Sequence, residues 1–213
     1  MIGGRSFDPA VKPQLTVRVD GREIDRPTLA PGPFLRFVTL PPDLAPGAGR
    51  GAYGRISVEA SRGSNVAIEQ FDASALRPLV GFGDGWHEQE LDPRTGLRWR
   101  WLSERGELHV RVPLTRLSLD RLEYAAVTLH LQGESPLEYF PRGSTLTVRS
   151  QGRVVLTRVL NADFSLDLPL SDPSQPIVLE TDQIYVPAER SRRTRDRRHL
   201  GLRIFKVWFT KAS

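Results

Sequence analysis

The sequence predicts an all-β protein of two related antiparallel β-sandwich (jelly-roll-like) units packed together. Three observations support this class. Apolar and polar residues alternate over many short segments, which is the period of a half-buried strand. Turn-forming residues, 18 Gly and 17 Pro, are spread along the whole chain. No segment has the 3.6-residue apolar period of a long amphipathic helix.

The composition excludes several classes of protein. The 213 residues include no cysteine, which excludes a disulfide framework, a thiolate metal site and a cysteine nucleophile. No apolar run approaches the roughly 20 residues of a membrane-spanning helix. The start of the chain is polar and shows no signal peptide, so we expect any export or anchoring segment to lie outside this sequence.

The first part of the chain contains five predicted strands. Residues 14–19 alternate strictly, and Asp20-Gly21 after them is typical of a hairpin turn. We expect residues 1–13 to be a loose lead-in and residues 41–52 to be a mobile loop. The predicted strands are residues 14–19, 22–29, 34–40, 53–60 and 65–71.

Residues 82–112 contain three of the four tryptophans and organise the next part of the chain. We predict a hairpin, with strands at 98–103 and 107–112 and a turn at Glu104-Arg105-Gly106. Trp99 and Trp101 alternate with arginines and therefore share one face. We expect this to be the core face; the alternative is that both tryptophans form a sugar-stacking platform with Trp86. On the return strand, Leu108, Val110 and Val112 share the apolar face.

Six further strands follow. Residues 122–131 are ambiguous, because Ala125-Ala126 favours a helix whereas the alternation from Val127 to Leu131 favours a strand; we predict a strand. The last strand, 200–209, carries apolar residues on both faces, so we expect it to be covered on both sides. The predicted strands are residues 122–131, 145–150, 153–160, 163–169, 176–181 and 200–209.

Part of the sequence is repeated at a constant offset of 131 residues. LTVR and Gly-Arg in residues 15–29 recur in residues 146–160. Phe34 then corresponds more loosely to Phe164, and Val66–Phe71 to Leu202–Phe209. We interpret this as a duplication, with a first unit at 1–75 and a second, fuller unit at 76–213. Convergent hairpin chemistry is the alternative. Because the first unit has no counterpart of 82–112, we expect it to be incomplete.

Residues around the GW turn are the candidate ligand contacts. A tryptophan in a Gly-rich turn is hard to bury and could stack on the apolar face of a sugar. The neighbouring acids and imidazole could supply hydrogen bonds. The candidate ligand-binding set is Trp86, His87, Glu88, Glu90 and Arg100.

The sequence indicates no catalytic residue, no metal site and no cofactor. Glu88 and Glu90 could act as the carboxylate pair of a glycosidase, and with His87 and Asp92 they could hold a structural Ca²⁺, but no ligand-spacing motif supports either role. His109 and His130 have no recognisable catalytic partner. GFGDG is not followed by a helix, so it does not predict a phosphate-binding loop.

A short basic segment accounts for the net charge of +5. Residues 190–199 contain six Arg and one Asp, so the rest of the chain is nearly neutral. This segment could be a solvated loop, a contact for phosphate or acidic lipid, or a nucleic-acid contact, which we rank last. The candidate phosphate or membrane contacts are Arg192, Arg193, Arg195, Arg197 and Arg198.

The order of these motifs resembles a known type of module. Gly85-Trp86, Arg98–Trp101, Leu146–Val154, Leu168–Leu170 and Asp196–Ile204 follow one another as in carbohydrate-binding-like β-sandwich modules appended to bacterial polytopic membrane glycosyltransferases. The resemblance covers residues 80–209, and the chain departs from it by lacking membrane helices and a transferase domain. It implies a location outside the cytoplasm, in the periplasm or at the cell surface.

We therefore expect a non-catalytic carbohydrate-associated module whose partners are a glycan or lipid-linked sugar and a membrane surface or membrane protein. Any catalysis would belong to a missing domain or partner. One alternative is a structural or assembly protein that binds another chain through open β edges and the basic loop. The other is a glycoside-acting enzyme.

Overall fold

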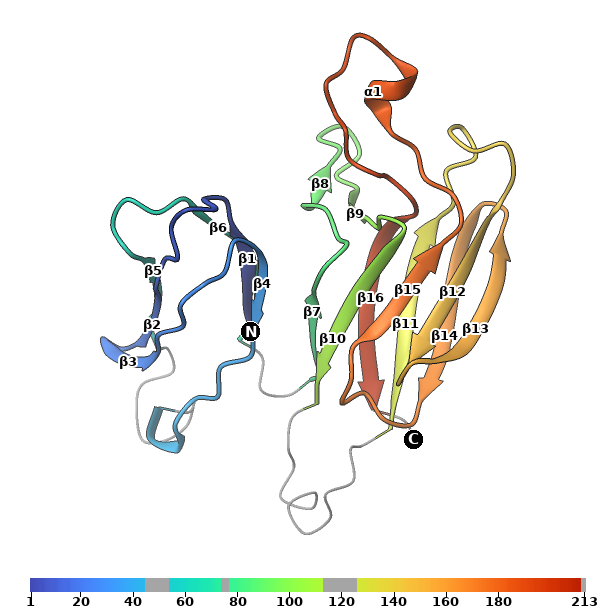
Figure 1. Cartoon of the computed structure of the whole chain (residues 1–213). Helices are drawn as coiled ribbons and strands as arrows, with labels where there is room; N and C mark the ends of the chain where they lie inside the picture. The colour runs from blue at the N-terminus through green and yellow to red at the C-terminus, as the bar shows by residue number, and fades with distance from the viewer. Residues whose placement is uncertain (45–53, 74–76, 113–125, 212–213) are drawn as a thin grey trace. The chain divides into compact units, whose positions relative to one another are not determined.

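The computed structural model describes residues 1–44, 54–73, 77–112 and 126–211. The chain divides into two compact units, Met1–Ala73 and Ser74–Ser213, and antiparallel sheets make up both (Figure 1). The predicted all-β class is confirmed. In the described residues, helical structure is limited to the short helix α1 (Pro187–Arg190) and a 3₁₀ turn, η1, at Pro42–Leu44.

Unit 1 is a small sandwich of two three-stranded sheets, ordered β4-β1-β6 and β3-β2-β5. Alternate residues of β2 face the other sheet, so Leu15 and Val17 are buried together with Ile2 and Leu29. The strands are β1 (Ile2–Ser6), β2 (Leu15–Val19), β3 (Arg22–Asp25), β4 (Gly32–Arg36), β5 (Ile56–Ala60) and β6 (Val66–Phe71).

Unit 2 has two five-stranded sheets. Sheet I has the order β14-β11-β16-β9-β8 and sheet II has the order β13-β12-β15-β10-β7. The strands are β7 (Leu79–Phe82), β8 (Glu90–Leu91), β9 (Arg98–Trp101), β10 (Arg105–Arg111), β11 (Val127–Glu134), β12 (Ser144–Ser150), β13 (Arg153–Leu160), β14 (Asp163–Leu170), β15 (Ile177–Thr181) and β16 (Arg203–Lys211).

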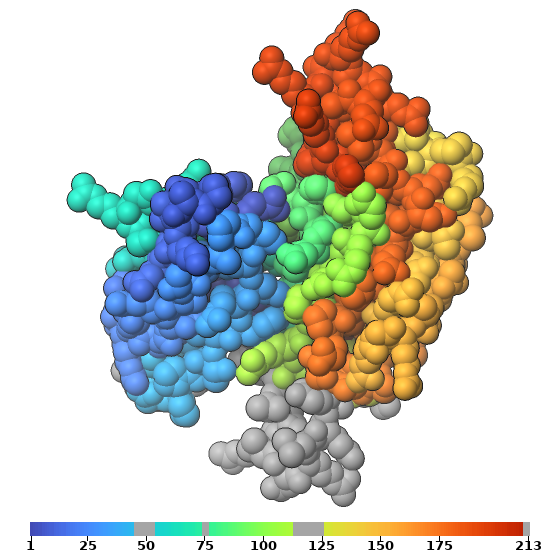
Figure 2. All heavy atoms as spheres, in the orientation of Figure 1, coloured from blue at the N-terminus to red at the C-terminus, as the bar shows by residue number. Residues whose placement is uncertain are grey.

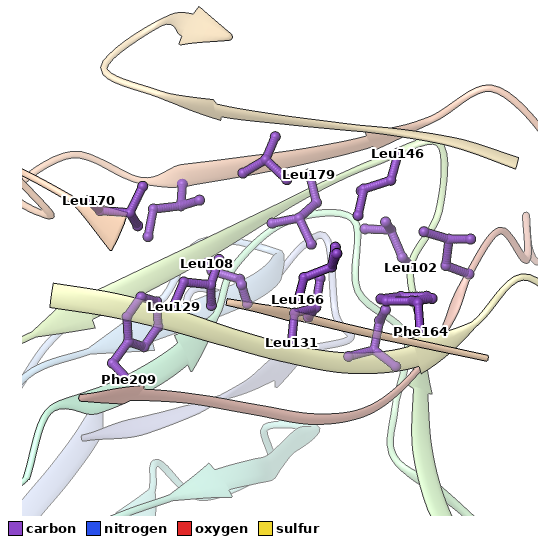
Figure 3. Close-up of a cluster of buried hydrophobic side chains, with 14 of the residues drawn as sticks. Leu102, Leu108, Leu129, Leu131, Leu146, Phe164, Leu166, Leu170, Leu179 and Phe209 are labelled. Atoms are coloured by element: carbon purple, nitrogen blue, oxygen red, sulfur yellow. The ribbon is translucent and has the colours of Figure 1, made fainter. Parts of the chain in front are cut away.

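The core of unit 2 lies between its two sheets. Leu129 and Leu131 from sheet I and Leu108 and Leu179 from sheet II are at most 1% exposed, and Figure 3 shows these side chains gathered with those of neighbouring strands. Strict alternation in β11 and β12 supplies one buried residue in every two. Burial of this apolar surface is the main stabilising contribution to the fold.

The two units share one six-strand arrangement. β1 to β6 are connected and paired in the same way as β11 to β16, in the same chain order. The β2–β3 hairpin pairs Val19 with Arg22 and has an irregularity before Arg18. The β12–β13 hairpin pairs Ser150 with Arg153 and has an irregularity before Arg149. Every one of these positions differs by the 131 residues of the sequence repeat.

Two further details coincide in the two units. A Cβ on Gly4 would lie 1.9 Å from the Ala67 carbonyl oxygen, and one on Gly133 would lie 2.3 Å from the Arg203 carbonyl oxygen, each beside a β-bulge. Arg18 is paired with Glu59 at 2.7 Å, and Arg149 with Glu180 at 2.9 Å, at matching positions of matching strands.

Unit 2 differs from unit 1 by four additional strands. β9 and β8 extend sheet I beyond β16, whereas β10 and β7 extend sheet II beyond β15. All four precede β11 in the chain. β8, β9 and β10 lie within residues 82–112, the segment that the sequence identified as lacking a counterpart in unit 1, and β7 ends where that segment begins.

The predicted hairpin at 98–112 is wrong. β9 pairs with β16 in sheet I, and β10 pairs with β15 in sheet II. Leu102 exchanges backbone hydrogen bonds with residues 201 and 202, which lead into β16 of sheet I, and the Glu104 carbonyl then accepts one from Thr181 of sheet II, at 2.9 Å. The segment 102–104 is therefore a corner between the sheets, with Leu102 buried in it. Leu108 is buried, and Val110 and Val112 pack against the core, as predicted.

The predicted loose lead-in at 1–13 is also wrong. Residues Ile2–Ser6 form β1, the central strand of its sheet, between β4 and β6. The strand was not predicted because it contains Gly3-Gly4, and glycine is unusual in strands except where another backbone approaches closely. The close carbonyl of Ala67 is such an approach.

The remaining strand predictions hold with altered ends. β3 stops at Asp25, although Thr28 forms an isolated bridge with Gln14. Residues 45–52 of the predicted loop, residue 53 of the predicted strand 53–60, and residues 122–125 of the predicted strand 122–131 lie outside the described residues. β16 carries a bulge at Phe205, which lets Ile204 and Phe209 both face the core without full coverage of both faces.

Candidate functional site

The outer face of sheet I carries three of the four tryptophans of the chain. Core residue Ile204 pairs with Arg100, and Arg203 pairs with Trp101. Paired residues point to the same side of a sheet, so Trp99 and Trp101 face outward with Arg203. They share a face, as predicted, and Trp101 is buried, at 4% exposed, as predicted. Neither belongs to the cluster between the two sheets, however, and Trp99 is only half-buried. We call Trp99, Trp101, His130, Gln132, Glu134, Arg203 and Trp208 the aromatic face.

A cluster of cation–π contacts around Arg203 occupies one end of the aromatic face. The Arg203 guanidinium lies 4.9 Å from the ring centre of Trp101 and 5.5 Å from that of Trp99. Glu134 and Glu138 accept hydrogen bonds from Arg203. Such desolvated cation–π contacts contribute on the order of 1–2 kcal/mol. Arg203 thereby fixes the two indole rings in position.

Two tyrosines extend this cluster. Tyr139 stacks on Tyr185 with ring centres 4.3 Å apart and lies 6.4 Å from Trp101. Burial, assisted by Glu138, raises the pKa of Tyr139 above its usual value, so its hydroxyl remains a hydrogen-bond donor at neutral pH. The tyrosines come from loops, and Trp101 and Arg203 come from strands.

A second aromatic pair lies at the other end of the face. The rings of His130 and Trp208 are stacked, with centres 4.7 Å apart, and Lys206 lies 4.6 Å from the Trp208 ring. His130 is held on both sides, by Asp167 at 2.7 Å and by Thr210 at 2.8 Å. These contacts fix the imidazole across three adjacent strands.

An open groove of about 390 Å³ lies between the two aromatic clusters. It lies at the bulge of β16, where Gly133, Phe164 and the additional residue Phe205 all line it. Polar groups surround this apolar base. The lining residues are Gln132, Gly133, Asp163, Phe164, Ser165 and Phe205.

Two residues of the sequence-predicted ligand set are buried. Trp86 is 5% exposed; its Nε1 donates to the Glu107 carbonyl at 2.9 Å, and its ring meets Phe82 edge to face. Arg100 is 8% exposed, lies over the Phe82 ring and donates to the His87 carbonyl at 3.0 Å. Trp86 is therefore a core residue and not a surface platform, and Arg100 supports the turn from beneath.

Glu90 connects two regions that the sequence treated separately. It accepts a hydrogen bond from Arg198 at 2.8 Å and another from the Trp101 indole at 3.4 Å. Arg198 also binds Asp196 through two nitrogens. These hydrogen bonds lower the pKa of Asp196 and raise that of Arg198. Arg198 therefore anchors the basic loop to β8, and both Glu90 oxygens are already engaged.

His87 lies beside a hydroxyl but cannot activate it. Its Nε2 is 2.9 Å from the His199 carbonyl oxygen and 3.1 Å from Ser103 Oγ. A carbonyl only accepts hydrogen bonds, so Nε2 must carry the proton and donate. The same nitrogen is then not a base toward Ser103. His199 itself is paired with Glu104.

The four other candidate arginines of the basic loop are exposed. Arg192, Arg193, Arg195 and Arg197 follow α1, and the loop rises from one end of unit 2 (Figure 1) with side chains projecting from its surface (Figure 2). Glu88 is half-buried in the turn before β8. In the part of the chain that the structure describes, no three acidic, histidine or cysteine side chains are grouped to hold a metal ion.

No family model, curated protein or solved structure matches the chain. None of the helices in the described ranges is sufficiently long and apolar to span a membrane.

Sequence reasoning missed most of the aromatic face. Trp208 and His130 lie on neighbouring strands, Tyr139 and Tyr185 on separate loops, and only the strand pairing brings them together. One signal was present in the sequence: in residues 127–131 and 207–209, an aromatic or imidazole ring takes the polar position of the alternation.

Proposed function

We propose that unit 2 is a non-catalytic carbohydrate-binding module whose ligand lies along the aromatic face. The observation that carries this proposal is the groove between two fixed aromatic clusters. Sugars offer apolar C–H faces, which stack on aromatic rings, and hydroxyls, which need polar partners. The groove combines Phe205 with Gln132, Asp163 and Ser165, which fits both requirements.

The resemblance to modules of membrane glycosyltransferases gives this proposal its context. In that setting the module acts outside the cytoplasm, in the periplasm or at the cell surface, beside a membrane protein that supplies the catalysis. The proton position on His87 and the hydrogen bonds that engage both Glu90 oxygens favour binding over glycoside chemistry.

The exposed arginines extend the proposal to phosphate. Arg192, Arg193, Arg195 and Arg197 would contact the phosphates of a lipid-linked sugar, because the guanidinium group pairs with phosphate through two hydrogen bonds. Arg198 is excluded from this role because it already holds two carboxylates.

Glycan-array binding followed by titration tests the proposal. We expect Gln132→Ala and Trp208→Ala to weaken binding at least about tenfold, a loss of about 1.4 kcal/mol. Val159→Ala, at a 58% exposed site on β13, is the matched control and should bind as the wild type does. Circular dichroism confirms that each variant is folded. A glycan bound equally well by all three variants would place its site elsewhere.

The phosphate extension is tested with the same sugar in free and phosphorylated forms. A variant with glutamine at the four exposed arginines should lose only the additional affinity conferred by the phosphate. Equal loss for both forms, or no loss for either, would contradict the extension.

A further inference from the structure

Apolar residues that are fully covered in unit 2 are more exposed at the corresponding positions of unit 1. Ile68 and Ile204 each pair with the glycine at the bulge, yet Ile68 is 42% exposed and Ile204 is 3% exposed. Val58 corresponds to Leu179 through its pairing with the central strand; it is half-buried, whereas Leu179 is fully buried. The same folding pattern therefore has an open side in unit 1.

Strands β9 and β10 cover these positions in unit 2. Arg100 of β9 pairs with Ile204, and Gly106 of β10 pairs with Leu179. Leu102 in the corner and Leu108 in β10 fill the space between the sheets, and both are 0% exposed. One continuous segment, Arg98–Arg111, thus adds a strand to each sheet and closes the core between them.

The corresponding strands of unit 1 are at the edges of their sheets. Among the described residues, β5 pairs with β2, and β6 pairs with β1, on one side each. Edge strands with apolar side chains tend to acquire a further strand, since their outer backbone groups can pair with another extended chain.

We propose that unit 1 is a strand acceptor, in which β5 and β6 bind an extended segment of another polypeptide. The occupant has the chemistry of Arg98–Arg111: one strand for each sheet, joined at a corner, with two large apolar side chains in the places of Leu102 and Leu108. Ile68 and Val58 are the acceptor residues that these side chains contact.

Charge gives the occupant a further feature. In unit 2, Arg105 of the added strand stands opposite Glu180. Glu59 takes the same position in unit 1, with a side chain that is 62% exposed. A basic residue of the bound segment is therefore placed opposite Glu59.

A fluorescein-labelled peptide of residues 97–112 is the probe, titrated with the full-length chain and followed by fluorescence anisotropy. We expect saturable binding that Ile68→Asp or Val58→Asp weakens at least tenfold. Val159→Asp, a charge placed on an exposed strand position of unit 2, is the matched control and should leave the Kd unchanged. A peptide with aspartate in place of Leu102 and Leu108 should not bind.

Hydrogen exchange of the complex identifies where the peptide lies. Amides of β5 and β6 should exchange more slowly when it is bound. The proposal is overturned if the wild-type chain shows no saturable binding. It is equally overturned if Ile68→Asp and Val58→Asp bind normally, because the peptide would then lie elsewhere, for example in place of its own copy in unit 2. Neither result bears on sugar binding by the aromatic face.

Discussion

Two glycines show how single residues determine the fold. At Gly4 and at Gly133, a neighbouring backbone carbonyl oxygen occupies the space that a side-chain methyl group would need. Their positions agree in both units, so the bulge and the glycine belong to one structural device. The sequence repeat was recognised only from residue 15 onward, so it did not predict that Gly4 and Gly133 correspond.

We predict that Gly4→Ala and Gly133→Ala destabilise the protein by about 2 kcal/mol or more each, because the added Cβ collides with backbone that cannot move aside. Urea unfolding measures the effect. Gly54→Ala is the control, since its Cβ would meet only ordinary contacts of 3.6 Å or longer. If the alanine variants at positions 4 and 133 unfold at the urea concentration of the control, the close approach is not rigid.

The orientation of Arg98–Trp101 shows the limit of prediction at this scale. Alternation correctly places Trp99 and Trp101 on one face. Hydrophobicity then assigns that face to the core, but the register with β16 turns Arg100 inward. The inward arginine is satisfied by the His87 carbonyl and the Phe82 ring, and neither contact can be deduced from the strand alone.

The positions of the strands were easier to predict than the strands with which they pair. The strands at 145–150, 163–169 and 176–181 were found within two residues of their observed ends, because turn residues bound an alternating segment. The 98–112 hairpin failed because a strand pattern contains no information about which sheet the strand joins. Leu102 and Leu108 are both buried, and that outcome fits a corner as well as a hairpin.

The basic loop is an element whose attachment depends on pH. Hydrogen bonds from Arg198 hold the pKa of Asp196 below its usual value, so the folded state favours the ionised carboxylate. Its stabilising contribution is present above the unfolded pKa of about 3.9 and is lost as the pH falls through the lower folded pKa.

We therefore predict that the wild type loses more stability than Asp196→Asn when the pH is lowered from 5 to 2.5. Urea unfolding at a series of pH values measures both slopes. Arg198→Gln should also flatten the dependence, because it removes the donor that lowers the pKa. Parallel curves for wild type and Asp196→Asn would show that this carboxylate does not contribute.

The two units differ in how much core they have. Among the described residues, the buried cluster of unit 1 has four members, and that of unit 2 has seventeen. Repetition in the sequence predicts the shared arrangement, and the missing counterpart of 82–112 predicts that one unit is smaller. Neither indicates which side of the smaller unit is open, because this depends on how β9 and β10 distribute between the sheets.

We predict that amides of β5 and β6 exchange with solvent at least about tenfold faster than those of β15 and β16 in the isolated protein. Their apolar neighbours are less buried, so local opening costs less free energy. Hydrogen–deuterium exchange with peptide-level mass spectrometry makes the comparison, with β2 and β12 as a matched pair of central strands. Equal protection of β5 and β6 and of β15 and β16 would mean that the exposed apolar positions do not weaken unit 1.

The corner at 102–104 has a mechanical consequence for unit 2. Its backbone is hydrogen-bonded to Leu202, directly before β16 of sheet I, and to Thr181 of sheet II. The two sheets are therefore connected by peptide hydrogen bonds as well as by apolar packing. A force that shears one layer past the other has to rupture those bonds first. Under tension, this domain should yield abruptly, in one step, rather than by gradual slippage.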